Sequence, residues 1–86
     1  MPLPQREKLK LTISARTLIA KNLVRLRAAK GWSQEDLAWD AGLQRTFVGQ
    51  VERELRNVSV DNVESLAAAL GVDIRELFAP SPDETK

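Results

Sequence analysis

The sequence predicts a compact all-α domain of five helices joined by short turns. Apolar residues recur at helical spacing along residues 14–78, with no internal repeat. Serine or aspartate precedes four of the expected helices and glycine follows three, as is typical of helix starts and stops. A chain of 86 residues suits one domain. We place this domain at residues 14–79, between an N-terminal basic arm (1–13) and a flexible tail (80–86).

The first two helices are expected on either side of a short turn. The first occupies residues 14–30, opened by Ser14 and closed by Gly31. Its inward residues are Leu18, Ile19, Leu23 and Leu26. The second lies in SQEDLAWDAG, beginning at the N-cap Ser33 and ending at Gly42. Its inward residues are Leu37, Ala38 and Ala41.

The third helix, in LQRTFVGQVERELRN, is expected from about Gln44 to Arg53. Its apolar stripe is narrow and consists of Leu43, Val48 and Val51. The opposite face is polar and partly aromatic, with Gln44, Arg45, Thr46, Phe47 and Gln50. Phe47 is expected to be exposed, serving no core. Gly49 costs roughly 1 kcal/mol inside a helix, which indicates a close backbone approach, either to sugar-phosphate or to the second helix.

The last two helices follow a loop at residues 54–58. The fourth runs from Ser59 to a stop at Gly71. Its inward residues are Val60, Val63, Leu66, Ala67 and Leu70. The fifth is short, in DIRELF, where Asp73 and Glu76 match the Asp-x-x-Glu pattern of a capping box.

The composition excludes several classes of protein. There is no cysteine and no histidine, so the chain lacks a disulfide framework, the usual general base and the commonest metal ligand. Catalysis would need a pair of carboxylates, but the acidic residues stand at helix starts, where capping explains them. We expect neither enzyme activity nor a cofactor or metal. No apolar run is long enough for a membrane span and no secretory segment is recognisable, so a cytoplasmic location is expected.

Charge is distributed unevenly along the chain. Residues 1–30 hold eight Lys or Arg and one Glu, a net +7, whereas residues 31–86 hold five basic and eleven acidic groups, a net −6. This asymmetry favours a polyanion partner, although a solvated basic helix face would also produce it. Near the start, KLKLTI alternates as a strand would. The arm is therefore either disordered, an edge strand pairing with a second copy, or a basic extension that reaches phosphates.

The two short helices around Gly42 match a helix-turn-helix. A helix of this kind enters the major groove of DNA, where side chains near its N-terminus reach base edges. Arg reads guanine, Gln pairs with adenine, and a Thr methyl or an aromatic ring packs on the thymine methyl. The outward face of residues 44–50 is thus predicted to face base pairs. The rival interpretation is a protein-interaction module, an antitoxin or adaptor. An affinity for duplex DNA that falls steeply as the salt concentration rises would distinguish DNA binding from this rival.

From about Ile19 to Phe78, the chain resembles the Xre/Cro-like helix-turn-helix family. The resemblance is carried by LVRLRAAKGWSQEDLAWDAGL, RTFVGQVERELRN and LAAALGVDIRELF. It implies a lambda-repressor-like five-helix fold. Within the family, the pattern Gln-Arg-Thr-Phe, Glu-Arg and Arg-Asn most resembles the controller proteins of restriction–modification systems.

The resemblance implies roles for individual residues. Gln34 would bind phosphate and brace the recognition helix. Arg56 and Asn57 would lie along the DNA backbone and, as in the controllers, help to read the site. Phe47 stands where controllers commonly have Tyr, so a hydroxyl hydrogen bond is absent there. Gly49 replaces a common Ser. The expected DNA-binding residues are Gln34, Gln44, Arg45, Thr46, Phe47, Gln50, Arg56 and Asn57.

Some residues are expected to serve structure first. Arg27 and Glu52 match a family pair that bridges the first and third helices. Trp32 is expected in the core. Trp39 is expected to be a surface aromatic, lying on the arm or on neighbouring helices, or else forming part of a contact surface.

The resemblance also implies partners. These are double-stranded DNA, a second copy of the chain in a homodimer on a palindromic operator, and RNA polymerase as a further candidate, with autoregulation as in the controllers. The protein would act in the cytoplasm, in association with the nucleoid. Apolar residues spare for the dimer contact are Val72, Ile74, Leu77 and Phe78, with Val60 as a further candidate. Alternatively, Leu77 and Phe78 merely close the monomer.

Overall fold

The computed structural model describes residues 13–80 and contains four α-helices and one short 3-10 helix. In chain order these are α1 (Ala15–Lys30), α2 (Gln34–Ala41), α3 (Arg45–Glu52), α4 (Val60–Leu70) and η1 (Ile74–Phe78). The expected arm and tail, apart from their innermost residues, lie outside this range. None of the helices within residues 13–80 is long and apolar enough to cross a membrane.

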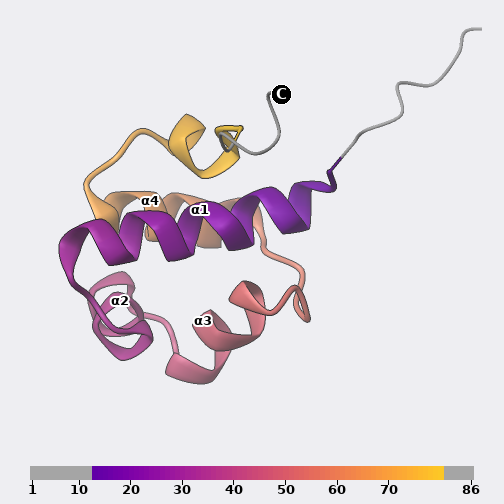
Figure 1. Ribbon diagram of the computed structural model, residues 1–86. Helices are drawn as coiled ribbons and strands as arrows, with labels where there is room; N and C mark the ends of the chain where they lie inside the picture. The colour runs from indigo at the N-terminus through magenta and orange to yellow at the C-terminus, as the bar shows by residue number, and fades with distance from the viewer. Residues whose placement is uncertain (1–12, 81–86) are drawn as a thin grey trace, which may run out of the picture.

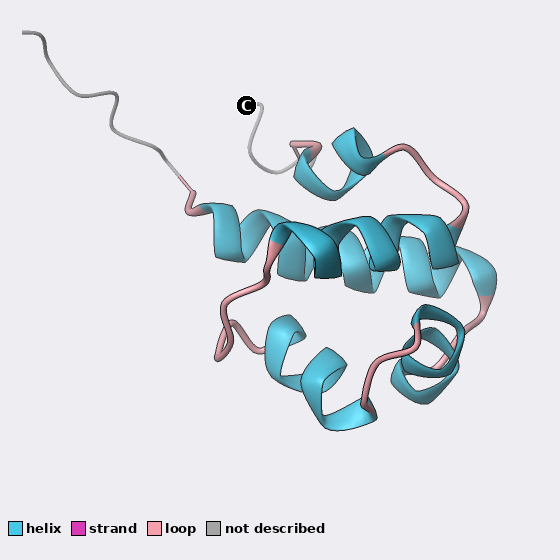
Figure 2. Cartoon of the chain, turned by 180° about the vertical axis from the view of Figure 1, so that it is seen from behind, coloured by secondary structure: helices cyan, strands magenta, loops and turns pink. Residues whose placement is uncertain are grey.

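The helices are arranged around α1. In Figure 1, α2 and α3 lie together on one side of α1, and η1 lies on the opposite side; Figure 2 shows the same order from behind. Helix α1 contacts both α3 and η1, while α4 contacts α2 and η1. This arrangement leaves α3 at an edge of the molecule, far from η1, with only one face covered.

Capping residues set the limits of α1, α2 and α4. Each begins after a serine whose hydroxyl accepts a hydrogen bond from a first-turn N–H, namely Ser14, Ser33 and Ser59. Each ends at a glycine with a φ of 70°, namely Gly31, Gly42 and Gly71. Glycine adopts this left-handed conformation without strain, and the following N–H groups bond back to the last turn. The predicted limits of these three helices are confirmed.

The core is built from the inward stripes of the helices. Its buried members are Ile19, Leu23, Leu26, Leu37, Ala38, Val48, Val51, Val63, Leu66, Ala67, Leu70 and Leu77. Among the predicted inward residues, Leu18, Ala41 and Leu43 are only partly buried, and Val60 is 85% exposed. Val60 has the same helical spacing as Val63 but stands in the first turn of α4, where no element within residues 13–80 covers it. Its predicted inward position is wrong.

The fifth helix is a 3-10 helix without the predicted capping box. The Asp73 carboxylate accepts the backbone N–H of Arg75 at 2.9 Å and its side-chain Nε at 3.0 Å. These bonds hold the pKa of Asp73 below its usual value. The Glu76 carboxylate instead lies 3.4 Å from Arg25 Nη2 on α1. A reciprocal capping box is present in α2, between Ser33 and Asp36.

A buried amide ties η1 to α1. Asn22, 2% exposed, donates from Nδ2 to the backbone carbonyls of Leu77 (3.0 Å) and Ala79 (2.8 Å). Its Oδ1 accepts from Arg25, so both ends of the amide are bonded. These bonds hold Leu77, which is fully buried, in the core between α1 and α4.

Candidate nucleic-acid interface

Helix α3 is anchored by its inner face and presents its outer face to solvent. Val48, Gly49 and Val51 are buried, whereas Gln44, Arg45 and Thr46 are exposed. The short turn after Gly42 places α3 against α2, the helix with which it makes its most extensive contact. The predicted helix-turn-helix geometry is therefore present, with the polar face outward.

Most of the predicted binding residues gather around two shallow hollows that flank α3. One hollow is lined by Gln34, Arg45, Thr46, Gly49, Gln50 and Arg53. The other is lined by Gly42, Leu43, Gln44, Thr46, Phe47, Arg56 and Asn62. Thr46 borders both hollows, so the two form one continuous surface. Asn57 is the one predicted residue that neither hollow includes.

The N-terminus of α3 is open. Within residues 13–80, α3 is the one helix whose N-cap side chain makes no capping hydrogen bond. Its first bonds back to the N-cap carbonyl come from the N–H groups of Phe47 (3.0 Å) and Val48 (3.2 Å). The N–H groups ahead of them carry the positive end of the helix dipole and remain available to an anion such as phosphate.

A charged network holds α3 against α1 and α2. Arg27 Nε lies 2.8 Å from Glu52 Oε2, and Arg27 Nη2 lies 2.9 Å from Glu52 Oε1. Arg27 Nη1 donates to the carbonyl of Trp32, and Gln34 Nε2 donates to Glu52 Oε1, both at 2.8 Å. The bidentate bond with Glu52 raises the pKa of Arg27. The expected pair of Arg27 and Glu52 is therefore present, with the Glu52 side chain only 5% exposed.

Phe47 is not the exposed aromatic that the sequence suggested. It is partly buried and packs against the core. The guanidinium of Arg56 lies 5.2 Å from the centre of its ring, and Arg56 Nη1 donates to Gln50 Oε1 at 3.2 Å. The expectation failed because the ring packs against the core and meets the Arg56 guanidinium from the loop after α3, contacts that helical spacing does not encode.

Helix α3 ends without a glycine. Glu54 takes the left-handed conformation, with a φ of 64°, that glycine takes after α1, α2 and α4. Its N–H bonds to the carbonyl of Val51 at 3.0 Å, and the N–H of Leu55 bonds to that of Gln50 at 2.8 Å. The hydroxyl of Thr17 donates to the Glu54 carboxylate, which ties this strained turn to α1.

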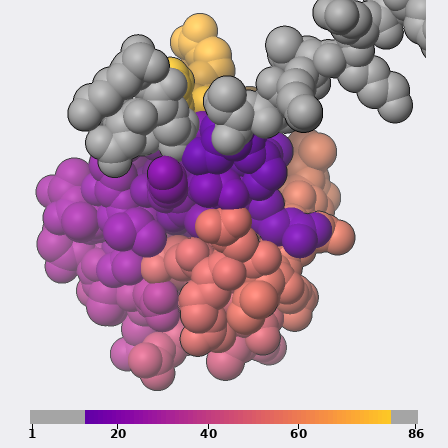
Figure 3. Space-filling model, turned by 45° about the vertical axis from the view of Figure 1, so that its right-hand side comes forward, coloured from indigo at the N-terminus to yellow at the C-terminus, as the bar shows by residue number. Residues whose placement is uncertain are grey.

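Asn57 lies on the α1 side of this loop rather than beside α3. Its Oδ1 accepts a hydrogen bond from Arg16. Figure 3 shows the chain that follows α3 lying against the start of α1. The contributions of Arg16, Thr17 and Glu54 were missed from the sequence. The absence of a glycine after α3 was the only sequence feature that could have indicated an unusual turn held by contacts with α1.

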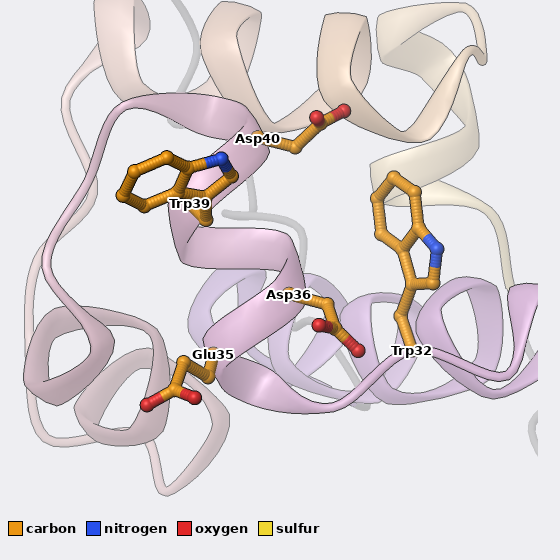
Figure 4. A pocket seen from close by; sticks show the side chains of 5 residues that line it. All are labelled: Trp32, Glu35, Asp36, Trp39 and Asp40. Carbon is orange, nitrogen blue, oxygen red and sulfur yellow. The ribbon is translucent and has the colours of Figure 1, made fainter.

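The two tryptophans differ in environment. Trp32 is partly buried against the core, as expected, with the Lys30 ammonium 4.8 Å from its ring centre. Trp39 is 86% exposed. Figure 4 shows the two indoles on either side of the carboxylates of Asp36 and Asp40, in a hollow that Glu35 also lines. Trp39 therefore does not lie on neighbouring helices of the described chain.

The apolar residues expected at a dimer contact separate into two groups. Leu77 is fully buried inside the monomer, so its predicted place in the contact is wrong. Asn22 and the packing of η1 on α1 turn its side chain into the core. Ile74 and Phe78 are 50% and 42% exposed, and Val72 is partly buried against the core. Ile74 and Phe78 belong to η1, which lies on the side of α1 opposite α3 (Figure 1).

Comparison with known proteins places this geometry in a family. The model of the helix-turn-helix family HTH_3 matches residues 23–77. A hypothetical transcription factor of Neisseria meningitidis serogroup B is 45% identical over 71 residues, which are 83% of this chain and 67% of the relative. The control protein C.BamHI of Bacillus amyloliquefaciens is 40% identical over 69 residues, 79% of this chain and 85% of the relative.

A solved structure agrees with these relatives. The restriction–modification controller protein C.AhdI from Aeromonas hydrophila is 51% identical, with a TM-score of 0.71 over 73% of this chain and 96% of that chain. The resemblance expected from the sequence is confirmed. The chain belongs to the HTH_3 helix-turn-helix family of DNA-binding transcription regulators, and it is similar to the control proteins of restriction–modification systems.

Proposed function

We propose that this protein reads double-stranded DNA in the major groove with α3. One observation carries the proposal. Helix α3 combines an uncapped N-terminus with an outward polar face, while its inner face is buried and braced by Gln34 and Glu52. Open N–H groups suit phosphate, and a rigid helix presents Arg45, Thr46 and Gln50 to base edges with little loss of backbone freedom.

The functional unit that we propose is a symmetric pair bound to a palindromic operator. One recognition helix reads only a few base pairs, and two-fold pairs place their helices in half-sites about 34 Å apart. The exposed residues Ile74 and Phe78, with Val72 beside them, offer an apolar contact for a second copy. By analogy with the control proteins among its relatives, the operator would lie upstream of the protein's own gene.

Footprinting on that upstream DNA tests this function. Two protected blocks separated by one helical turn, related by inverted symmetry, are expected. Binding should weaken steeply with salt, because Lys and Arg release counterions from the phosphates that they neutralise. If no segment of this DNA were protected and the affinity for DNA did not change with salt, DNA would not be the partner.

A contact with a protein is a second candidate, favoured by the outer face of α2. An indole that is 86% exposed, beside three carboxylates, is an unusual surface that base reading does not use. RNA polymerase is the first partner to test. Trp39→Ala should then leave operator binding unchanged but lower transcription from the operator-bearing promoter in vitro. Equal transcription by both proteins would remove this candidate.

A further inference from the structure

Three side chains join the recognition helix to the loop that follows it. Arg56 stacks on the ring of Phe47, with 5.2 Å from the guanidinium carbon to the ring centre. The same guanidinium donates from Nη1 to Gln50 Oε1 at 3.2 Å. The backbone reinforces this link, since the N–H of Leu55 donates to the carbonyl of Gln50 at 2.8 Å. Arg56 is therefore held at the edge of α3 from two sides.

This contact changes what Gln50 can offer to a base. A free Gln amide presents one acceptor and one donor side by side, which matches the N6 donor and N7 acceptor of adenine. Here Arg56 donates to Oε1 and so takes one of its two lone pairs, in competition with the amino group of an adenine, whereas the Nε2 donors remain. The other N–H groups of Arg56 stand beside them, and guanidinium has no acceptor at all. The combined surface of Gln50 and Arg56 therefore presents many more donors than acceptors.

We propose that Gln50 and Arg56 act together as a donor pair that selects guanine, with Phe47 positioning the guanidinium. This inference rests on the proposed reading of DNA by α3. Guanine is the base whose major-groove edge presents two adjacent acceptors, N7 and O6. Adenine and cytosine would each set an amino donor against a donor on the protein, and thymine offers a single acceptor. Gln50 is accordingly not the adenine reader that a glutamine alone would be.

The role of Phe47 in this arrangement is indirect. Its ring is partly buried against the core, and its exposed side is the surface on which Arg56 rests. Phe47 is therefore a positioning residue. Leucine at this position would retain an apolar side chain toward the core but would remove the aromatic face, so Phe47→Leu tests the stack without emptying the core.

The experiment measures binding to duplexes in which each position of the footprinted half-site carries each of the four base pairs in turn. Gln50→Ala first identifies the pair that Gln50 reads, as the one position where base preference is lost. The parent protein should prefer guanine there by about tenfold or more, as good base contacts provide. Replacing that guanine by 7-deazaguanine, which lacks the N7 acceptor, should remove much of the preference.

Arg56→Ala provides the decisive comparison. It frees Gln50 Oε1, so the preference at this position should move from guanine toward adenine, and Phe47→Leu should move it in the same direction by less. Uniform weakening on all four duplexes would instead make Arg56 a backbone contact and overturn the inference, as would an unchanged base preference in Gln50→Ala. Either result leaves the proposed function standing. A parent protein that binds none of the duplexes overturns that function as well.

Discussion

Gly49 of α3 lies directly against Gln34 of α2. A β-carbon at position 49 would stand 3.2 Å from Gln34 Oε1, closer than an ordinary van der Waals contact. Gln34 is held there by its bond to Glu52 at 2.8 Å. The close approach suggested by a glycine inside a helix is therefore to the second helix. The glycine leaves room for the side chain that braces α3.

This relationship predicts a coupling between the two positions. In the parent protein, Gly49→Ala should change the free energy of unfolding little. The better helix propensity of alanine, worth roughly 1 kcal/mol, is offset by displacement of Gln34 and loss of a hydrogen bond worth about 0.5–1.5 kcal/mol. In a Gln34→Ala background, Gly49→Ala should stabilise the protein. Urea denaturation of the four proteins in this cycle measures the coupling. Identical effects in both backgrounds would show that the contact carries no energy.

Glu52 is predicted to contribute to stability rather than to base reading. Glu52→Ala leaves the partly buried guanidinium of Arg27 without its carboxylate and leaves Gln34 Nε2 without an acceptor. Breaking such a pair costs about 3–5 kcal/mol when it is fully buried, and we expect a loss of a few kcal/mol here. Thermal unfolding followed by circular dichroism measures it. Glu52→Gln, which retains an acceptor for Gln34, should lose less. A variant with parental stability but without DNA binding would move Glu52 into the binding surface.

Arg45 and Gln34 are predicted to differ in what they recognise. Arg45 is exposed at the open start of α3 and should read a base, so Arg45→Ala should lose roughly 1–3 kcal/mol on the operator and relax preference at one base pair per half-site. Gln34 is expected to bind phosphate, which every sequence presents, so Gln34→Ala should weaken operator and random DNA alike. Competition binding against both DNAs separates the two effects. If Arg45→Ala kept both affinity and base preference, α3 would not be the reading helix.

Phe78 is predicted to hold two copies of the chain together. Burying a Phe side chain contributes about 1.5–3 kcal/mol per subunit, and a charge at position 78 should prevent this. Because Phe78 is 42% exposed in the monomer, Phe78→Glu should still fold. Sedimentation velocity at micromolar concentration should show a dimer for the parent and a folded monomer for the variant. A folded dimer of Phe78→Glu, or a parent that stays monomeric even on DNA, would refute this contact.

Leu77 serves as the matched control for that experiment. It is adjacent in sequence but fully buried. Leu77→Ala should lose about 2–5 kcal/mol of monomer stability, as other core leucines do. It should not act on the dimer specifically. Two neighbouring apolar residues are thus expected to fail in different ways, one by unfolding and one by dissociation.

The parts of the fold that the sequence predicted well are those governed by neighbouring residues. The starts at Ser14, Ser33 and Ser59 depend on a side chain and an N–H group a few positions apart. Inward residues such as Leu66 and Leu70 follow from the helical period alone. The polar outer face of α3 was predictable for the same reason, since Val48 and Val51 specify which side is buried.

The parts that failed depend on which elements meet. Phe47 and Val60 were placed by helical spacing. Phe47 instead packs against the core and meets Arg56 from the following loop, and Val60 is left exposed at the start of α4. Glu76 was expected to cap its own helix, yet it faces Arg25 on α1. Helical spacing predicts the direction in which a side chain points, but it does not predict which element, if any, lies in that direction.

The sequence by itself therefore determined the helices, their limits, their inner faces and the family to which the chain belongs. Capping, turn formation and helical periodicity act over a few residues and need no knowledge of the rest of the chain. Only the tertiary structure decided that Gln34 fills the space beside Gly49, that Arg56 donates to Gln50 Oε1, and that Leu77 rather than Phe78 closes the core. Each of these contacts depends on how separate segments approach one another, and that approach is set by the packing of the whole core.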